Sequence, residues 1–154
     1  MWEVKVVAEI GAVLLLSVCG IWDIRKKRIP VRVLVLGSIW ALVCILIRYF
    51  SGDIQEKETL LQIAGSVAVA VLPGIFFLLL SFLTEKKVGY GDGLLLLILG
   101  LMEGVTVVGF TCCMALFLQA LVAVVLVVAR KADKQTEIPF VPFLFLARII
   151  YVFW

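Results

Sequence analysis

Residues 89–102 read Gly-Tyr-Gly-Asp-Gly followed by the apolar run Leu-Leu-Leu-Leu-Ile-Leu-Gly-Leu-Met, so that Asp92 stands directly ahead of the run. A run of this kind is typical of a lipid bilayer, where a carboxylate is costly and marks a functional site by default. Gly89, Gly91 and Gly93 leave the backbone around this carboxylate free of side chains. The stretch therefore predicts a membrane helix that carries a functional acid at its mouth.

The rest of the chain has the same character, with 64% hydrophobic and 16% charged residues and a mean hydropathy of +1.21. About 20 apolar residues make one spanning helix. Four stretches have this length: residues 4–22, 31–50, 60–83 and 105–129. Two shorter segments, residues 90–102 and 140–154, bring the expected number of spans to six. We expect an all-α polytopic membrane protein, with residues 1–154 forming a single membrane domain built as a bundle of about six transmembrane helices.

The basic residues predict how such a bundle lies in the membrane, because short loops rich in Lys and Arg stay in the cytoplasm. With six spans, one side receives ten of the fourteen basic residues: Arg25, Lys26, Lys27, Arg28, Arg32, Lys86, Lys87, Arg130, Lys131 and Lys134. We therefore expect a multi-pass protein of the plasma membrane with both termini outside. The first apolar stretch lacks a preceding basic region and a small-residue cleavage site, so we expect it to remain in the mature chain.

The composition also excludes several classes of function. The basic residues lie at membrane ends without interleaved aromatic residues, which argues against nucleic acid as a partner. The chain has no histidine, so Ser-His-Asp triads and most zinc hydrolase schemes are excluded. The four cysteines lie inside apolar stretches without the C-x-x-C spacing of a zinc ribbon, and we interpret them as buried small residues: Cys19, Cys44, Cys112 and Cys113. We expect neither a metal nor a cofactor.

Small residues at helix-packing spacing predict two close helix contacts. Gly100 and Gly104 form a G-x-x-x-G pair, and Ser66 and Ala70 form a looser version of it.

A second carboxylate lies at the same predicted depth as Asp92. Asp23 closes the first span and opens a basic loop, which places both aspartates at the cytoplasmic level. Two carboxylates that share a pocket of low dielectric carry one proton between them, so that one activates water while the other protonates a carbonyl. The alternative is a solvated helix end at which Asp23 pairs only with Arg25 or Lys26.

Three segments together resemble the type IV prepilin peptidases, a bacterial family of G-x-G-D membrane aspartyl proteases. Residues 23–30 (DIRKKRIP) look like that family's D-x-R-x-R-x-I-P segment, and residues 89–92 look like its G-x-G-D. Residues 138–143 (IPFVPF) look like its I-P-F-x-P-F. Three positions depart from the common family pattern, where Val31 replaces asparagine, Leu94 replaces lysine and Val141 replaces glycine.

The resemblance implies an aspartic-type endopeptidase in which Asp23 and Asp92 are the catalytic pair. It implies a prepilin or pseudopilin substrate, cut between its leader and its hydrophobic helix at the cytoplasmic face of the bacterial inner membrane. The chain lacks the family's cysteine-rich insert and a glycine loop for S-adenosylmethionine, so we expect a peptidase without methyltransferase activity. Short forms of this kind often serve Flp/Tad-type pili. We further expect Gly89, Tyr90, Gly91 and Gly93 to bind the substrate.

Two other interpretations compete with this one. A presenilin-like protease would share the G-x-G-D chemistry, but its Pro-Ala-Leu element is absent from the sequence. A non-catalytic scaffold or transporter-like component of a pilus or secretion system is the alternative from another class. Transporters carry ionisable groups near the middle of the bilayer, whereas the aspartates here lie near the ends of the predicted spans.

Overall fold

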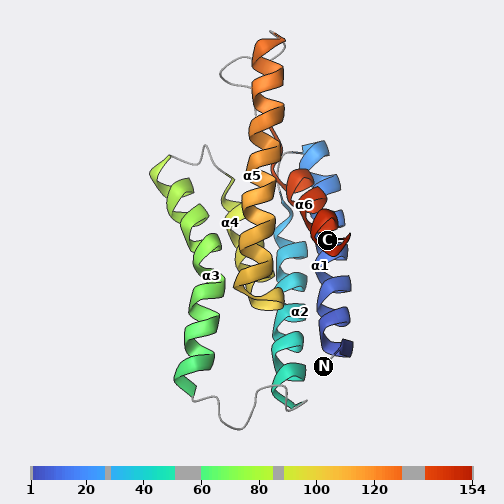
Figure 1. Cartoon of the computed structure of the whole chain (residues 1–154), viewed down its shortest axis with the longest axis vertical. Helices are drawn as coiled ribbons and strands as arrows, with labels where there is room; N and C mark the ends of the chain where they lie inside the picture. Colours follow the sequence, from blue (N-terminus) through green and yellow to red (C-terminus); the bar gives the residue numbers. More distant parts are fainter. Residues whose placement is uncertain (1, 27–28, 51–59, 85–88, 130–137, 154) are drawn as a thin grey trace.

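The computed structural model describes residues 2–26, 29–50, 60–84, 89–129 and 138–153. These residues form six α-helices and, within that part of the chain, no strand. In chain order the helices are α1 (Trp2–Lys26), α2 (Val31–Phe50), α3 (Leu60–Leu83), α4 (Tyr90–Glu103), α5 (Val105–Val128) and α6 (Val141–Phe153). The all-helical bundle expected from the sequence is confirmed (Figure 1).

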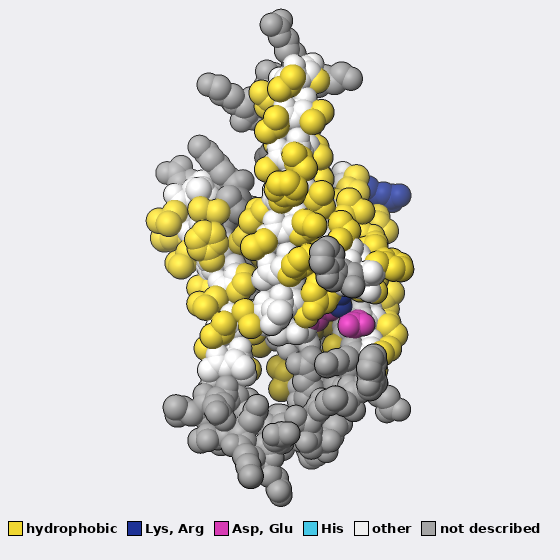
Figure 2. Space-filling model, in the orientation of Figure 1, with side chains coloured by type: hydrophobic (Ala, Val, Ile, Leu, Met, Phe, Trp, Pro, Cys, Tyr) yellow, Lys and Arg dark blue, Asp and Glu magenta, His cyan; other side chains and the backbone are white. Residues whose placement is uncertain are grey.

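The outer surface of this bundle is apolar. Hydrophobic side chains cover most of the described surface in Figure 2, and Phe82, Phe117 and Val128 are among the most exposed. Three helices are long and apolar enough to cross a bilayer, over Val6–Lys26, Gly65–Leu83 and Val105–Val128. The stretches Val31–Ile47 and Val141–Phe153 are shorter but also apolar. Such a surface is unfavourable in water and favourable in lipid, so the chain is a membrane protein.

The helices alternate in direction, so that α1, α3 and α5 end, and α2, α4 and α6 begin, at one end of the bundle (Figure 1). The G-x-G-D segment and Asp23 therefore lie at the same end. Most of the basic residues on which the orientation was predicted, including Lys86, Lys87 and Arg130, lie outside the described residues. The orientation in the membrane stays a prediction.

Helix α4 is the centre of the bundle and contacts α1, α2, α3 and α5. It is apolar around most of its circumference, with Leu95, Leu96, Leu99 and Met102 almost completely buried. A helix that is hydrophobic on all sides has to be surrounded by other helices. This burial fixes the position of the G-x-G-D segment, which forms the start of α4.

Glycines allow α3 and α4 to approach closely. A Cβ on Gly100 would lie 2.1 Å from the carbonyl oxygen of Ala70, and a Cβ on Gly74 would lie 2.6 Å from the backbone nitrogen of Leu97. The predicted roles of Gly100 and Ala70 in helix packing are thus confirmed.

The predicted packing role of Gly104 is wrong. A Cβ there would meet no described atom within 4 Å, and the residue has φ 87°, a left-handed conformation that favours glycine. Gly104 forms the tight turn between α4 and α5 instead, and its N–H donates to the carbonyl of Gly100 at 2.9 Å. Its spacing from Gly100 reflects a helix end rather than a second contact.

The cysteine prediction is confirmed for three positions and wrong for one. Cys19, Cys44 and Cys112 are buried, whereas Cys113 is exposed on α5. Adjacent helix positions face directions about 100° apart, so both members of a neighbouring pair rarely face the same core.

Candidate functional site

Asp23 lies in the last turn of α1 and is only 7% exposed. Its Oδ2 accepts a hydrogen bond of 3.1 Å from the backbone N–H of Val141, at the start of α6, and the N–H of Phe140 also donates to the carboxylate. Pro139 and Pro142 have no N–H. All of the N–H donors in residues 139–142 are therefore directed at Asp23. The positive end of the α6 dipole faces the same carboxylate.

The backbone that supplies these donors is held by two other helices. The side-chain amide of Gln119, on α5, donates to the carbonyl oxygen of Ile138 at 3.4 Å. The ring of Phe140 is buried against Phe77 of α3, with 5.3 Å between the ring centroids. The I-P-F-x-P-F segment thus does more than lead the chain back into the membrane: it orients an acid on α1.

Asp92 lies in the first turn of α4, where its backbone N–H donates to the carbonyl of Gly89 at 3.1 Å. Its half-buried carboxylate folds back toward this turn. A Cβ on Gly89 would lie 2.7 Å from Asp92 Oδ2. Because Gly89 itself has φ −61° and ψ 117°, which any residue adopts, the glycine is required by space for the carboxylate and not by backbone conformation.

The two aspartates act on each other. Helices α1 and α4 are in contact, and Asp23 is close enough for its negative charge to act on the Asp92 carboxyl. The charges of both aspartates reach Cys19, which is fully buried one turn before Asp23 on α1. In the alternative interpretation Asp23 would pair with a basic residue at the end of α1. Lys26 does not take this role, because its ammonium lies 4.4 Å above the Trp22 ring. The structure thus assembles a pair of carboxylates at one end of the bundle.

The remaining residues predicted for the site have different surroundings. Tyr90 is 57% exposed and points away from the core. A Cβ on Gly91 would lie 3.1 Å from the side chain of Ile29, which covers the start of α4. Gly93 is buried, and a Cβ there would lie 3.0 Å from the backbone nitrogen of Leu78 on α3. Gly93 is thus a helix-packing glycine, while the substrate-binding roles of this segment stay a prediction.

Replacing Gly89 by alanine tests whether the position of the Asp92 carboxylate matters. We expect the fold to be kept and the leader cleavage that the sequence resemblance implies to fall by roughly 10- to 100-fold, since the methyl group would displace only a flexible carboxylate. The measurement is the single-turnover cleavage rate at equal membrane abundance. Gly109→Ala is the matched control, because a Cβ at that helical position would meet no described atom within 4 Å. Equal rates for the two variants would contradict this role of Gly89.

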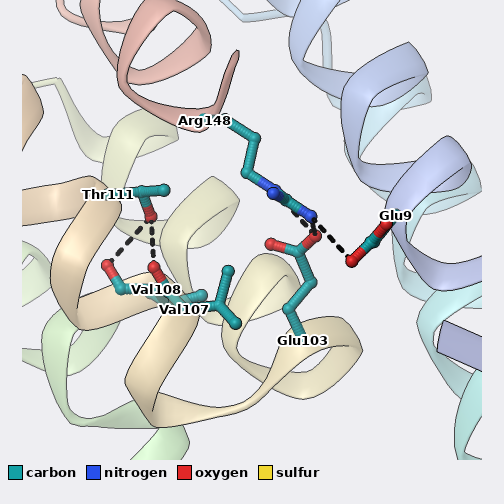
Figure 3. Close-up of polar contacts among 6 residues, drawn as sticks. All are labelled: Glu9, Glu103, Val107, Val108, Thr111 and Arg148. Carbon is teal, nitrogen blue, oxygen red and sulfur yellow. Dashed lines mark hydrogen bonds and ion pairs between the residues drawn. The ribbon is translucent and has the colours of Figure 1, made fainter. Parts of the chain in front are cut away.

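Sequence reasoning missed the partners of Asp23 on α6 and a buried ion pair farther along the same helix. The structure buries Arg148, on α6, against Glu103 at the end of α4 (Figure 3). A charged residue inside an apolar segment was the available signal. The sequence pattern contained no information about its partner.

Comparison with known proteins agrees with the geometry. Residues 10–128 match the model of the type IV leader peptidase family, and this range contains both Asp23 and Asp92. No curated protein and no solved structure matches the chain. A family match over this much of a membrane bundle, with its two interacting carboxylates inside the matched range, identifies the chain as a member of the type IV leader peptidase family.

Proposed function

We propose that this chain is an aspartic-type endopeptidase that removes the leader from type IV prepilin or pseudopilin precursors. The observation that supports this most strongly is that Asp23 and Asp92 lie at one end of the bundle, within reach of each other's charge, in a chain of the leader peptidase family. In this proposal Asp23 and Asp92 act jointly on the scissile peptide bond.

The chemistry requires only the two carboxylates and water. One carboxylate removes a proton from water as its oxygen attacks the carbonyl carbon, and the other protonates the carbonyl oxygen. The tetrahedral diol then loses the amine, which takes a proton from one carboxyl group as the C–N bond breaks. A hydroxyl of the diol gives its proton to the other carboxylate as the new C=O forms, so the pair again holds one shared proton. The N–H groups of Phe140 and Val141 hold Asp23 in a fixed orientation during this cycle.

The substrate in this proposal has a hydrophilic leader joined to a hydrophobic helix. The helix lies in the lipid beside the bundle, which places the leader junction at the level of the aspartates. Tyr90, exposed at the start of α4, is the position where the extended leader backbone would approach, and Ile29 would have to move aside for it to reach Gly91. We propose the cytoplasmic side of the inner membrane as the location, an unmethylated product and a Flp/Tad-type pilus as the system.

The test is coexpression of the full chain with a prepilin from the same genome, followed by mass spectrometry of the mature pilin. We expect a new, unmethylated amino terminus at the junction between leader and hydrophobic helix. A secreted precursor with an ordinary signal peptide is the control and should remain unchanged by this chain. Absence of cleavage with every candidate prepilin would contradict the proposal.

Cys19 provides a separate check on the type of chemistry, because it is a thiol buried beside both aspartates. We assign it to packing only, so Cys19→Ala should cleave within about threefold of the wild-type rate. The measurement is the single-turnover rate, together with the rate after treatment with a thiol-alkylating reagent. A loss of a hundredfold in Cys19→Ala at normal abundance would indicate a thiol nucleophile and contradict the aspartyl mechanism.

A further inference from the structure

Arg148 is the most deeply buried charged side chain in the described part of the chain, with 1% of its surface exposed. Its guanidinium binds Glu103 at the end of α4 through Nε, at 2.9 Å, and through Nη2. Glu9 of α1 lies at the edge of this cluster, 4.0 Å from Nη2 and half exposed (Figure 3). Nη1 has no hydrogen-bond partner among the described residues. Charge is thus concentrated where α1, α4 and α6 meet.

Burying such a pair contributes little net stability, because the desolvation of both charges offsets their attraction. A pair of apolar side chains of similar size would stabilise the contact between two helices equally well. An ion pair differs because it is directional: Nε and Nη2 both reach one carboxylate oxygen, Oε1 of Glu103. A shift of α6 along its own axis by one residue would break these two hydrogen bonds and weaken the compensation of both buried charges. The best-attested role of such groups is to fix register.

The register fixed by this pair is that of the helix that orients Asp23. Val141 and Arg148 are seven residues apart on α6, about two turns, and therefore lie on the same face of the helix. Val141 donates to Asp23 at one end of this face, and Arg148 binds Glu103 at the other. Glu103 and Asp92 are likewise the two ends of α4, so each of these helices carries one contact at the site and one at the ion pair.

We propose that Arg148 and Glu103 are positioning residues that tie α6 to the end of α4 and thereby lock the register of α6 along α1, which holds the Val141 N–H on Asp23. The expected effect of these two residues on cleavage rests on the proposed peptidase function. Its structural part, the register of α6, is measurable without any substrate.

A disulfide between α1 and α6 reports this register. A Cβ on Gly20 would lie 4.0 Å from the Cα of Pro142. Cysteines at these two positions can therefore bring their Cβ atoms to the separation of about 3.5–4.5 Å that a disulfide requires. The parent for the experiment is the full chain with its four cysteines replaced by alanine and with Gly20→Cys and Pro142→Cys added. We expect mild oxidation in membranes to cross-link most of this parent, as measured by blocking of maleimide labelling.

Arg148→Met and Glu103→Gln are then introduced separately into this parent. We expect each to lower the initial rate of cross-linking at least fivefold, because α6 no longer has one preferred register. Arg148→Lys, which keeps a charge but not the fork, should have an intermediate rate. Thr111→Val is the matched control, since the buried Thr111 hydroxyl donates only to carbonyls of its own helix, at Val107 and Val108, and does not reach Arg148 (Figure 3).

Cleavage provides the second measurement. In the wild-type cysteine background Arg148→Met should lower kcat about 10- to 100-fold with little change in KM, because the acid is misplaced while the substrate still binds. In the cross-linking parent carrying Arg148→Met, forming the disulfide should restore most of the lost rate. If Arg148 acted only on overall stability, the disulfide between positions 20 and 142 would not restore the cleavage rate.

The outcomes separate the two proposals. An unchanged cross-linking rate in Arg148→Met and Glu103→Gln would overturn the register lock, whatever happens to cleavage. A reduced cross-linking rate, found together with a wild-type chain that cleaves no prepilin, would support the lock and contradict the peptidase. If Arg148→Met fails to accumulate, the charge-exchanged variant Glu103→Arg/Arg148→Glu takes its place, and cross-linking no faster than in Glu103→Gln would then overturn the lock.

Discussion

Replacing either Asp23 or Asp92 by asparagine should reduce leader cleavage by about a thousandfold or more, because the reaction needs both an acceptor and a donor of protons at the peptide bond. The change is close to isosteric. In Asp23→Asn the side-chain carbonyl oxygen can still accept the N–H of Val141, so the contact between α1 and α6 is kept. The measurement is the single-turnover rate of precursor cleavage, quantified by mass spectrometry.

Both variants should accumulate in the membrane as the wild-type chain does, since each replacement is close to isosteric and lowers the repulsion between the two carboxyl groups. Thr111→Val again serves as a buried control that leaves the site intact. Cleavage by either asparagine variant at more than a tenth of the wild-type rate would show that the carboxylate in question is not catalytic.

The largest effect on stability is expected from Gly100→Ala. A methyl group there would lie 2.1 Å from the carbonyl oxygen of Ala70, and backbone on both sides leaves no flexible group to move. Helices α3 and α4 would have to separate, at a cost of about 3 kcal/mol. The measurement is the free energy of unfolding in detergent, obtained from a denaturant titration.

Gly109→Ala is the matched helical control for this prediction. A Cβ there would meet no described atom within 4 Å, so the change should leave stability equal or raise it by about 0.5 kcal/mol through helix propensity. Unfolding free energies that are the same for Gly100→Ala and Gly109→Ala would contradict the close contact between α3 and α4.

The sequence was sufficient to predict those features of the fold and the site that depend on local sequence pattern. Apolar stretches of about 20 residues predict the helices, and the order of these helices places Asp23 and Asp92 at one end of the bundle. Spacing of small residues marked Gly100 and Ala70 as packing positions, but it did not show that they contact each other. The same rule failed at Gly104 because a glycine that ends a helix has the same spacing as one that packs.

Contacts between distant segments could not be predicted in this way. The hydrogen bond from Val141 to Asp23 joins residues 118 positions apart, and its donor is a backbone group that no residue type identifies. Arg148 was visible as an anomaly inside an apolar segment, but the choice of Glu103 as its partner depends on how α6 packs on α1 and α5 and on where α4 ends. The sequence did contain a signal for the hydrogen bond to Asp23, because Pro139 and Pro142 enclose two residues that have N–H groups. This signal can be interpreted only when the acceptor is known.

The central claim is that Asp23 and Asp92 work as one catalytic unit, and a double-mutant comparison tests it most directly. Single-turnover rates of prepilin cleavage are measured, with long incubation and mass spectrometric quantification, for the wild-type chain, Asp23→Asn, Asp92→Asn and the double variant. Groups that act as a unit are non-additive, so we predict that the double variant is within about threefold of either single variant. A double variant whose loss equals the product of the two single losses would show that the aspartates act independently, and would contradict the dyad.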